Sequence, residues 1–446
     1  MKTRLIHFWE RLSSTYWFLP ALMVVLAIGL SLATNVLDQA IEYQPTRLVW
    51  LYAGGAEGTR TLLSTIAGSM ITIAGVTFSI TIVALTLAAS QFGPRLLANF
   101  MRDRGNQIVL GTFIATFTYC LLVLRTVRDV ADNTFVPHIS ATFAVLLAMA
   151  SMGVLIYFIH HVATSIQANH VIAAVGRELD EAITRLFPET MSSGYLDLEL
   201  KHEDDIPTDL EQEGRPIPAD QSGYLQAIDY DGLKKIAIEN DLVLRLEHRP
   251  GDFVTRGSEL ITIIRCGESL EEKKVVEQIN SAFIIGVQPD PLQDVEFAIN
   301  QLVQIAVRAL SPGINDPFTA MACIDRLGAS LVYLSERSIP SGYFYDDENK
   351  LRLITDAVTF AGITEAAFNQ IRQYGRSSVA VTVHLLETIA VIAAHTENEA
   401  YRTTLLRQAV MIKRGSEEAV LEEGDRKAIE RRYEFVRQAL DKHQVV

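Results

Sequence analysis

The chain has 446 residues, of which 49% are hydrophobic, with a mean hydropathy of +0.19 and a formal net charge of −14 at pH 7. Residues 1–170 carry 10 Lys and Arg against 7 Asp and Glu, a balance of +3, whereas residues 171–446 carry 29 against 46, a balance of −17. An apolar, weakly basic first part and an acidic remainder indicate a membrane protein with a large soluble part, and they argue against nucleic acid or anionic lipid as the partner of the soluble part.

The first apolar run follows three basic residues, Lys2, Arg4 and Arg11. It covers residues 16–36, which is longer than the apolar core of a usual signal peptide, and further apolar runs come after it. We therefore expect the first transmembrane helix at residues 16–36. Pro20 falls in the first turn of this helix, where a proline costs least.

The second apolar run, residues 62–89, contains no Asp, Glu, Lys or Arg and is long enough to cross a bilayer as a tilted helix. Hydroxyl residues recur at every seventh position of this run and share one side of the helix: Thr65, Thr72, Ser79 and Thr86. Such a stripe is typical of a helix that packs on other helices or lines water, and the sequence leaves both roles open. A stripe that lines a pore must face a symmetry axis, so that role predicts a homo-oligomer.

Two more spans are predicted at residues 107–124 and 139–159, which completes a four-helix transmembrane domain over residues 1–164. The N-terminal tail and the loop between the second and third spans hold six Lys and Arg, and the other two loops hold four. The positive-inside rule then favours a cytoplasmic N-terminus, and four spans return the chain to the cytoplasm. We expect a multi-pass protein of the bacterial inner membrane with both termini cytoplasmic.

The soluble part begins with two segments of different character. Residues 165–187 are predicted as a helical extension of the fourth span, and an apolar face supports this prediction: Ile172, Val175, Leu179 and Ile183. Residues 188–221 are rich in Asp, Glu and Pro, and we interpret them as an acidic linker.

The rest of the soluble part reads as strands followed by helices. Residues 222–265 are predicted to be β-rich, and the phrase RPGDFV at residues 249–254 resembles the turn and strand of biotinyl/lipoyl-type barrels, which implies a small barrel-like unit. Residues 270–446 are predicted to be mainly helical. The expected fold is therefore an α-helical polytopic membrane domain followed by a cytoplasmic α+β domain.

One soluble motif concentrates polar groups beside a helix start, the phrase RALSPGINDP at residues 308–317. A structural account is nearly complete, because Asp316 is a good N-cap and Pro317 a good first helical residue. A functional account adds that four of its residues could hold an anion or a polar ligand at that helix N-terminus: Arg308, Ser311, Asn315 and Asp316. The sequence favours the cap and leaves the ligand loop open.

Two stretches carry a resemblance to a known family. Residues 68–128, beginning GSMITIAGVTFSITIVALTLAASQFGPRLLANFMRDRG, and the phrase RALSPGINDPFTA at residues 308–320 resemble the DUF2254 family of predicted bacterial membrane proteins. The resemblance extends over nearly the whole chain. It implies a few N-terminal spans and a cytoplasmic C-terminal region, and it brings no catalytic residues.

No motif for nucleotide binding, serine hydrolysis or metalloprotease chemistry occurs, so we expect no enzyme, no cofactor and no metal site. The three scattered cysteines, Cys120, Cys266 and Cys323, are read as buried thiols. The favoured function is an oligomeric, channel- or transporter-like conduit for a small ion or polar ligand in the lipid bilayer, regulated by its cytoplasmic domain. The alternative is a membrane-anchored receptor or scaffold that binds a ligand or partner around residues 308–317.

Overall fold

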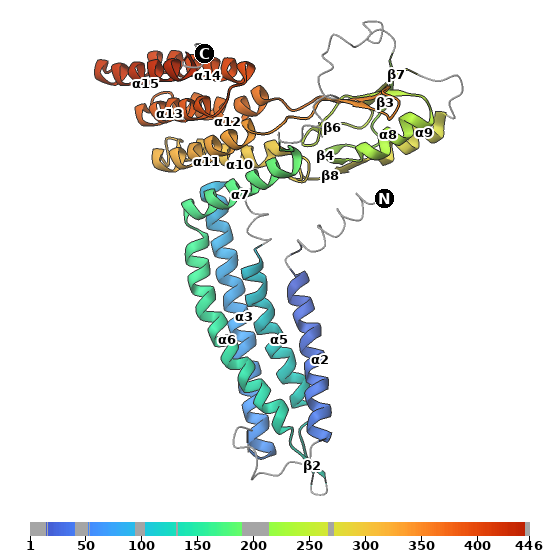
Figure 1. The fold of residues 1–446 in the computed structure, drawn as a ribbon. Helices are drawn as coiled ribbons and strands as arrows, with labels where there is room; N and C mark the ends of the chain where they lie inside the picture. The colour runs from blue at the N-terminus through green and yellow to red at the C-terminus, as the bar shows by residue number, and fades with distance from the viewer. Residues whose placement is uncertain are drawn as a thin grey trace. The chain divides into compact units, whose positions relative to one another are not determined.

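The computed structural model describes residues 15, 17–40, 52, 54–93, 103–130, 133–189, 214–265 and 272–441. The chain divides into two compact units, Met1–His170 and Val171–Val446. Unit 1 contains long apolar helices, and unit 2 contains helices together with β-sheets (Figure 1). The predicted order of a helical membrane part followed by a mixed α and β part is confirmed.

Within the described part of unit 1, four helices are long and apolar enough to cross a membrane: α2 (Phe18–Ala40), α3 (Ala56–Phe92), α5 (Arg104–Leu124) and α6 (His138–Ser165). The longest, α3, has 37 residues and therefore measures about 55 Å, well above the ~30 Å of a bilayer core. It ends at Gly93, whose φ of 110° suits glycine and whose N–H donates to the Ala89 carbonyl at 3.1 Å. Between α5 and α6, strands β1 (Arg128–Val130) and β2 (Asn133–Phe135) form a short antiparallel hairpin.

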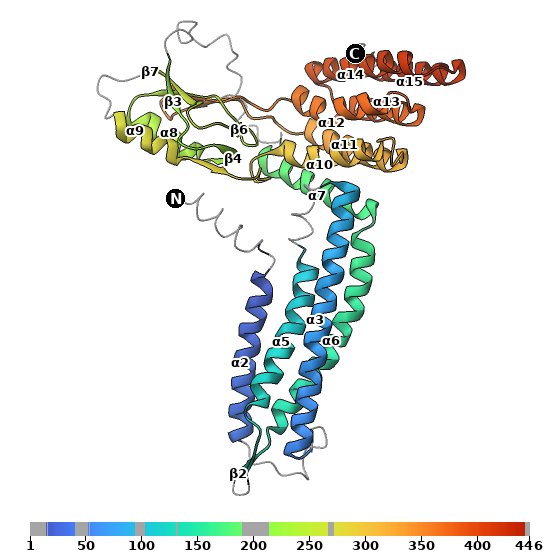
Figure 2. The same cartoon turned by 180° about the vertical axis from the view of Figure 1, so that it is seen from behind.

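Helix α5 lies at the centre of unit 1 and contacts α2, α3 and α6 (Figure 2). Half of the residues in the most apolar stretch of α5 are buried, whereas the corresponding share is 17–22% for the other three helices. These three helices therefore present most of their surface outward. Large side chains of α5, Phe113 and Tyr119, fill the space between the helices against the smaller Ala67 and Ala74 of α3. Alternating large and small residues allow these helices to pack closely.

Helix α7 (Ala168–Leu186) is separate from α6, because Ile166 and Gln167 interrupt the helical pattern that the sequence predicted to run on from the fourth span. From Val171 onward α7 belongs to unit 2, where its predicted apolar face is buried. Gly176 allows a close approach to α11 (Pro317–Ser335), since a Cβ at Gly176 would lie 3.2 Å from Arg326 Cδ.

The strands described in unit 2 form two β-sheets. One has the strand order β3-β7-β5-β10-β9 and consists of β3 (Arg215–Pro218), β7 (Glu259–Arg265), β5 (Val243–Leu246), β10 (Leu351–Ile354) and β9 (Tyr343–Tyr345). The other has the order β6-β4-β8 and consists of β6 (Phe253–Val254), β4 (Gly223–Ile228) and β8 (Phe283–Gly286). Helices α8 (Tyr230–Glu239) and α9 (Glu272–Ser281) share one apolar core with both sheets through residues such as Leu233, Ile279 and Leu244.

The barrel-like unit predicted at residues 222–265 is not confirmed, because neither sheet closes on itself within the described residues. The strands of this segment divide between the two sheets and pair with strands from elsewhere in the chain. Strand β5 pairs in parallel with β10, and β4 pairs antiparallel with β8. The segment therefore lacks the partners needed to close a barrel alone.

The remaining helices form three antiparallel hairpins that stack on one another (Figures 1 and 2). The hairpins are α10 (Val295–Ala309) with α11, α12 (Phe360–Gly375) with α13 (Val379–Ala394), and α14 (Glu399–Ala419) with α15 (Glu423–Asp441). One layer consists of α10, α12 and α14, and the other of α11, α13 and α15. This two-layered stack is the arrangement of α-solenoid repeats, in which each hairpin buries its apolar face against its neighbours.

Candidate functional site

The hydroxyl stripe of α3 faces away from the other three helices of unit 1. All four of its members are exposed: Thr65, Thr72, Ser79 and Thr86. The buried residues of α3 lie on the opposite side of the helix, at about 100° of rotation per residue: Leu63, Ala67, Met70, Ala74, Thr77 and Ala88. The stripe therefore takes no part in the contacts among these four helices.

The hydroxyl groups of the stripe are bonded within their own helix. Each donates to the backbone carbonyl four residues earlier, at 2.7 Å for Thr65, 2.8 Å for Thr72, 3.0 Å for Ser79 and 2.9 Å for Thr86. Their oxygen atoms remain able to accept further bonds. Gly68 and Gly75 lie beside the stripe, and a Cβ at either would meet no atom within 4 Å, so this face of α3 is flat and open.

The hydroxyl groups that do join the helices were missed by the sequence analysis. The Tyr119 hydroxyl of α5 lies 3.0 Å from Thr34 Oγ1 of α2 and donates to the Ser140 carbonyl of α6 at 3.1 Å. Thr116 of α5 and Ser151 of α6 are likewise 3.1 Å apart and buried. A tyrosine in the middle of an apolar span was the available signal, because a buried phenol must find hydrogen-bond partners.

Asp103 and His161 connect the start of α5 to the last turns of α6. Asp103 Oδ1 accepts from the Gly105 N–H at 2.8 Å and caps α5, while Asp103 Oδ2 lies 2.6 Å from His161 Nε2. Tyr157 stacks on the His161 ring with centroids 5.3 Å apart. His161 thus belongs to a structural contact between two helices, and His160 is exposed.

The motif at residues 308–317 forms a turn between α10 and α11. Asp316 caps α11 by accepting from the Thr319 N–H at 3.2 Å and from the Thr319 hydroxyl at 2.6 Å, and these bonds lower the pKa of Asp316. Asn315 takes φ = 49°, and its N–H donates to the Ser311 carbonyl at 2.9 Å. The Ser311 hydroxyl donates to the Arg308 carbonyl at 2.7 Å.

The local turn thus explains three of the four residues of the predicted ligand loop. Ser311, Asn315 and Asp316 shape the turn and cap the helix. Arg308 differs, because its Nε atom is buried and has no hydrogen-bond partner among the described residues. Its guanidinium group remains available for another role.

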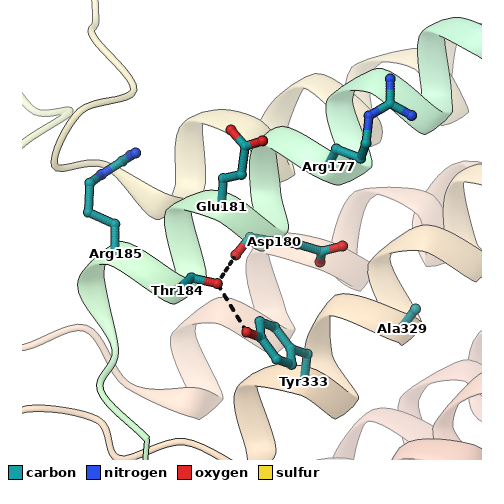
Figure 3. A pocket seen from close by; sticks show the side chains of 7 residues that line it. All are labelled: Arg177, Asp180, Glu181, Thr184, Arg185, Ala329 and Tyr333. Carbon is teal, nitrogen blue, oxygen red and sulfur yellow. Dashed lines mark hydrogen bonds between the residues drawn. The ribbon is translucent and has the colours of Figure 1, made fainter.

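A groove of about 600 Å³ lies between α7 and α11 (Figure 3). Seven residues line it: Arg177, Asp180, Glu181, Thr184, Arg185, Ala329 and Tyr333. Hydrogen bonds join the two helices along the groove, since Ser330 Oγ donates to Asp180 Oδ1 at 2.6 Å and Thr184 Oγ1 lies 3.0 Å from the Tyr333 hydroxyl. The Tyr333 hydroxyl also accepts from Arg337, whose side chain is buried.

The hydrogen bonds along the groove therefore attach α7 to the helical stack. Arg185 extends this attachment by donating to the backbone carbonyls of Leu292 and Pro291, both at 3.0 Å. Because only Ile166 and Gln167 separate α7 from α6, the chain passes directly from a membrane helix into this attachment.

Comparison with known proteins gives a family but no activity. A family model described as "Predicted membrane protein (DUF2254)" matches residues 13–391. Two uncharacterized proteins, one of Mycobacterium bovis and one of Mycobacterium tuberculosis, are each 30% identical to this chain over 420 residues, which is 94% of this chain and 79% of theirs. No solved structure matches the chain.

Proposed function

The chain belongs to the DUF2254 family of predicted membrane proteins, and we propose that it assembles in the bacterial inner membrane into an oligomeric, channel- or transporter-like conduit. In this proposal α3 helices of several copies surround a common axis, and the hydroxyl stripe lines or gates the path along it. Both termini lie in the cytoplasm, where unit 2 regulates the path.

The observation that carries the proposal is the position of the stripe on the outward face of α3, opposite the buried face. Small residues along this face follow alternating steps of three and four residues: Thr65, Gly68, Thr72, Gly75 and Ser79. This spacing is the pattern by which one helix meets another along a seam. None of the described helices of unit 1 packs on this face of α3, so a second copy is the partner that we propose.

Contact with lipid is the competing explanation of the stripe. A hydroxyl that donates to the carbonyl four residues earlier loses little in an apolar environment, so lipid alone would not expel these residues. The two glycines favour the seam, because glycine is a poor helix residue in water and an open glycine face gains packing only when another helix approaches it. Each hydroxyl in such a helix contact adds only ~0.6 kcal/mol, so the whole face must act together.

Ion or solute flux through the purified protein in liposomes tests this function. Ser79→Leu and Thr86→Leu each place an apolar side chain on the stripe, and we expect either change to alter the flux. Ile80→Leu is the matched control, because it places the same leucine about 100° around the helix from position 79. Wild-type protein with no flux above empty liposomes would rule out the conduit.

The second candidate is a membrane-anchored receptor or scaffold that binds a ligand or partner at residues 308–317. Its support is narrower, because Ser311, Asn315 and Asp316 have local structural duties. If this function is correct, Asn315→Ala or Asp316→Ala abolishes binding of that partner, and changes on the stripe of α3 have no effect.

A further inference from the structure

The C-terminal half of the first helix in each of the three stacked hairpins carries an arginine, Arg308 in α10, Arg372 in α12 and Arg414 in α14. The ends of α10 and α12 lie together, because Leu310 Cδ1 is 3.5 Å from the position that a Cβ on Gly375 would take. Arg308 comes two residues before Leu310, and Arg372 comes three residues before Gly375. We call these three residues the arginine row.

The contacts between α12 and α14 fix the register of the second and third members of the row. Glu365 of α12 forms an ion pair with Arg407 of α14, and Gln408 Nε2 donates to Asn369 Oδ1 at 3.3 Å. Arg372 and Arg414 each follow the Glu365–Arg407 pair by seven residues, which is two helical turns. Their charges are consequently close enough to interact.

The guanidinium groups of the arginine row lack bonded partners within the described part of the chain. Among the described residues, no hydrogen bond or ion pair is made by the guanidinium groups of its three members, and the Nε atoms of Arg308 and Arg372 are buried without a partner. Burial, together with the positive charge of Arg414, lowers the pKa of Arg372. Arg372 is partly buried beside the like charge of the exposed Arg414, so an anion bound between them would relieve both the desolvation of Arg372 and the repulsion.

We propose that Arg372 and Arg414, together with Arg308, bind an anion that carries phosphoryl groups. Guanidinium groups match phosphate oxygens with paired N–H donors, and the donors of these three arginines make no bond among the described residues. Neighbouring helices lie about 8–10 Å apart, so a ligand with more than one phosphoryl group suits a row that crosses three helices. The phosphoryl groups belong either to a soluble phosphate compound or to an anionic lipid headgroup.

A purely structural role makes the opposite prediction for stability. Arg308 and Arg372 stand in the last turns of their helices, where a cation stabilises the helix dipole. If that were their whole purpose, Arg372→Gln would lower the unfolding temperature of the ligand-free protein. Our proposal expects Arg372→Gln and Arg414→Gln to leave that temperature unchanged or raise it, because each removes an unpaired charge.

The test is a titration of the full-length protein in a neutral detergent with inorganic pyrophosphate, followed by the unfolding temperature and by calorimetry. Wild-type protein should gain stability with pyrophosphate, and Arg372→Gln and Arg414→Gln should weaken binding by about tenfold or more. Arg407→Gln is the matched control, because Arg407 lies on the same pair of helices but is already paired with Glu365, and it should bind as wild type does.

Lipid nanodiscs separate the two sources of phosphate. If the ligand is a soluble compound, the pyrophosphate effect persists in phosphatidylcholine discs. If the ligand is a headgroup, phosphatidylglycerol discs stabilise wild type relative to phosphatidylcholine discs, and Arg372→Gln loses that difference. Absence of both effects, or an equal loss in Arg407→Gln, would overturn the proposal. The proposal is independent of the conduit, since binding is measured without flux.

Discussion

The carboxylate of Asp38, near the end of α2, holds the first turn of α6 through Ser140. Asp38 Oδ2 accepts from the Ser140 hydroxyl at 2.6 Å and from its N–H at 2.9 Å, while Oδ1 accepts from the Ile139 N–H at 2.7 Å. An acceptor from a neighbouring helix thus replaces the cap that α6 lacks in its own sequence, because its N-cap residue is Pro137.

Removing this contact should destabilise unit 1. We expect Asp38→Ala to cost about 1–2 kcal/mol, which is the usual cost of losing a helix cap, because it frees two backbone N–H groups and one hydroxyl. The measurement is the unfolding temperature of the purified protein in detergent. Gln39→Ala is the control, since exposed Gln39 makes only a 3.4 Å bond to Asn35, and an equal loss in both variants would contradict the prediction.

Asp294 gives unit 2 a pH-dependent stability. It caps α10 by accepting from the Phe297 N–H at 3.2 Å, and the backbone of Gly251 (φ = 102°) lies so close that a Cβ there would be 2.5 Å from Asp294 Oδ2. Burial, with a contribution from Glu296, raises the pKa of Asp294 to about 7. The folded protein therefore binds this proton more tightly than the unfolded chain does.

The direction in which stability changes with pH follows from the raised pKa of Asp294. The stabilising contribution of protonated Asp294 is complete below the ordinary pKa of aspartate and is lost as the pH rises through about 7. We expect the unfolding temperature to fall as the pH rises from about 4, near the ordinary pKa of aspartate, to about 7, and we expect Asp294→Asn, which can still cap the helix, to remove that fall.

Asp316→Asn is the control for Asp294, because it changes the same chemistry at the cap of α11. Hydrogen bonds from Thr319 lower the pKa of Asp316, so its contribution is present above the ordinary pKa and is lost in acid. Asp316→Asn should therefore leave the dependence of the unfolding temperature on pH unchanged near neutral pH. If Asp294→Asn kept the fall in unfolding temperature that wild type shows with rising pH, the fall could not be assigned to Asp294.

The sequence predicted helices better than strands, for a reason visible in β3. Its residues Arg215–Pro218 fell within the predicted acidic linker, because Pro216 and Pro218 argue against a strand. Yet β3 is an edge strand that pairs only with β7 among the described strands, and an edge tolerates the missing N–H groups of proline. Strand β8 is equally short, and its pairing with β4 connects segments about 60 residues apart that no local pattern relates.

For the candidate sites too, the sequence predicted what depends on neighbouring residues but not what depends on contacts between distant segments. A period of seven places Thr72 and Ser79 on one side of a helix, but it cannot say whether that side meets its own chain or something else. The role of Asp316 as a cap was readable because capping is local, and the structure confirms it. The approach of Arg372 to Arg414 depends on the stacking of hairpins, so it became visible only in three dimensions.

The Tyr333 hydroxyl is one of the polar contacts that attach α7 to α11. Tyr333→Phe removes one of the two partners of the Thr184 hydroxyl and one of the partners of the buried Arg337, so we expect a loss of about 1–3 kcal/mol in the stability of unit 2. Thermal unfolding measures it, with Tyr374→Phe as the control, because Tyr374 is 58% exposed. Equal behaviour of the two variants would show that the hydroxyl does not hold α7.

The proposed orientation of the chain can be tested by labelling single cysteines in intact cells. Asp129 lies in β1, between α5 and α6, and Ser377 lies between α12 and α13; both are exposed. With both termini in the cytoplasm, a membrane-impermeant maleimide should label Asp129→Cys from outside and label Ser377→Cys only after permeabilisation. The opposite pattern would reverse the topology and remove the cytoplasmic role of unit 2.

The seam on α3 predicts which cysteines can join two copies. In a background with Cys266→Ser, we expect Thr72→Cys or Ser79→Cys to give a covalent dimer under mild oxidation in the membrane, because a helix seam brings equivalent positions of two copies together. The native thiols at Cys120 and Cys323 are buried and should not interfere. Phe78→Cys, which is 47% exposed but about 100° away on the helix, should stay monomeric. Dimers at all three positions would indicate random collision. Dimers at none of them would indicate that the hydroxyl stripe faces lipid and does not line the proposed path.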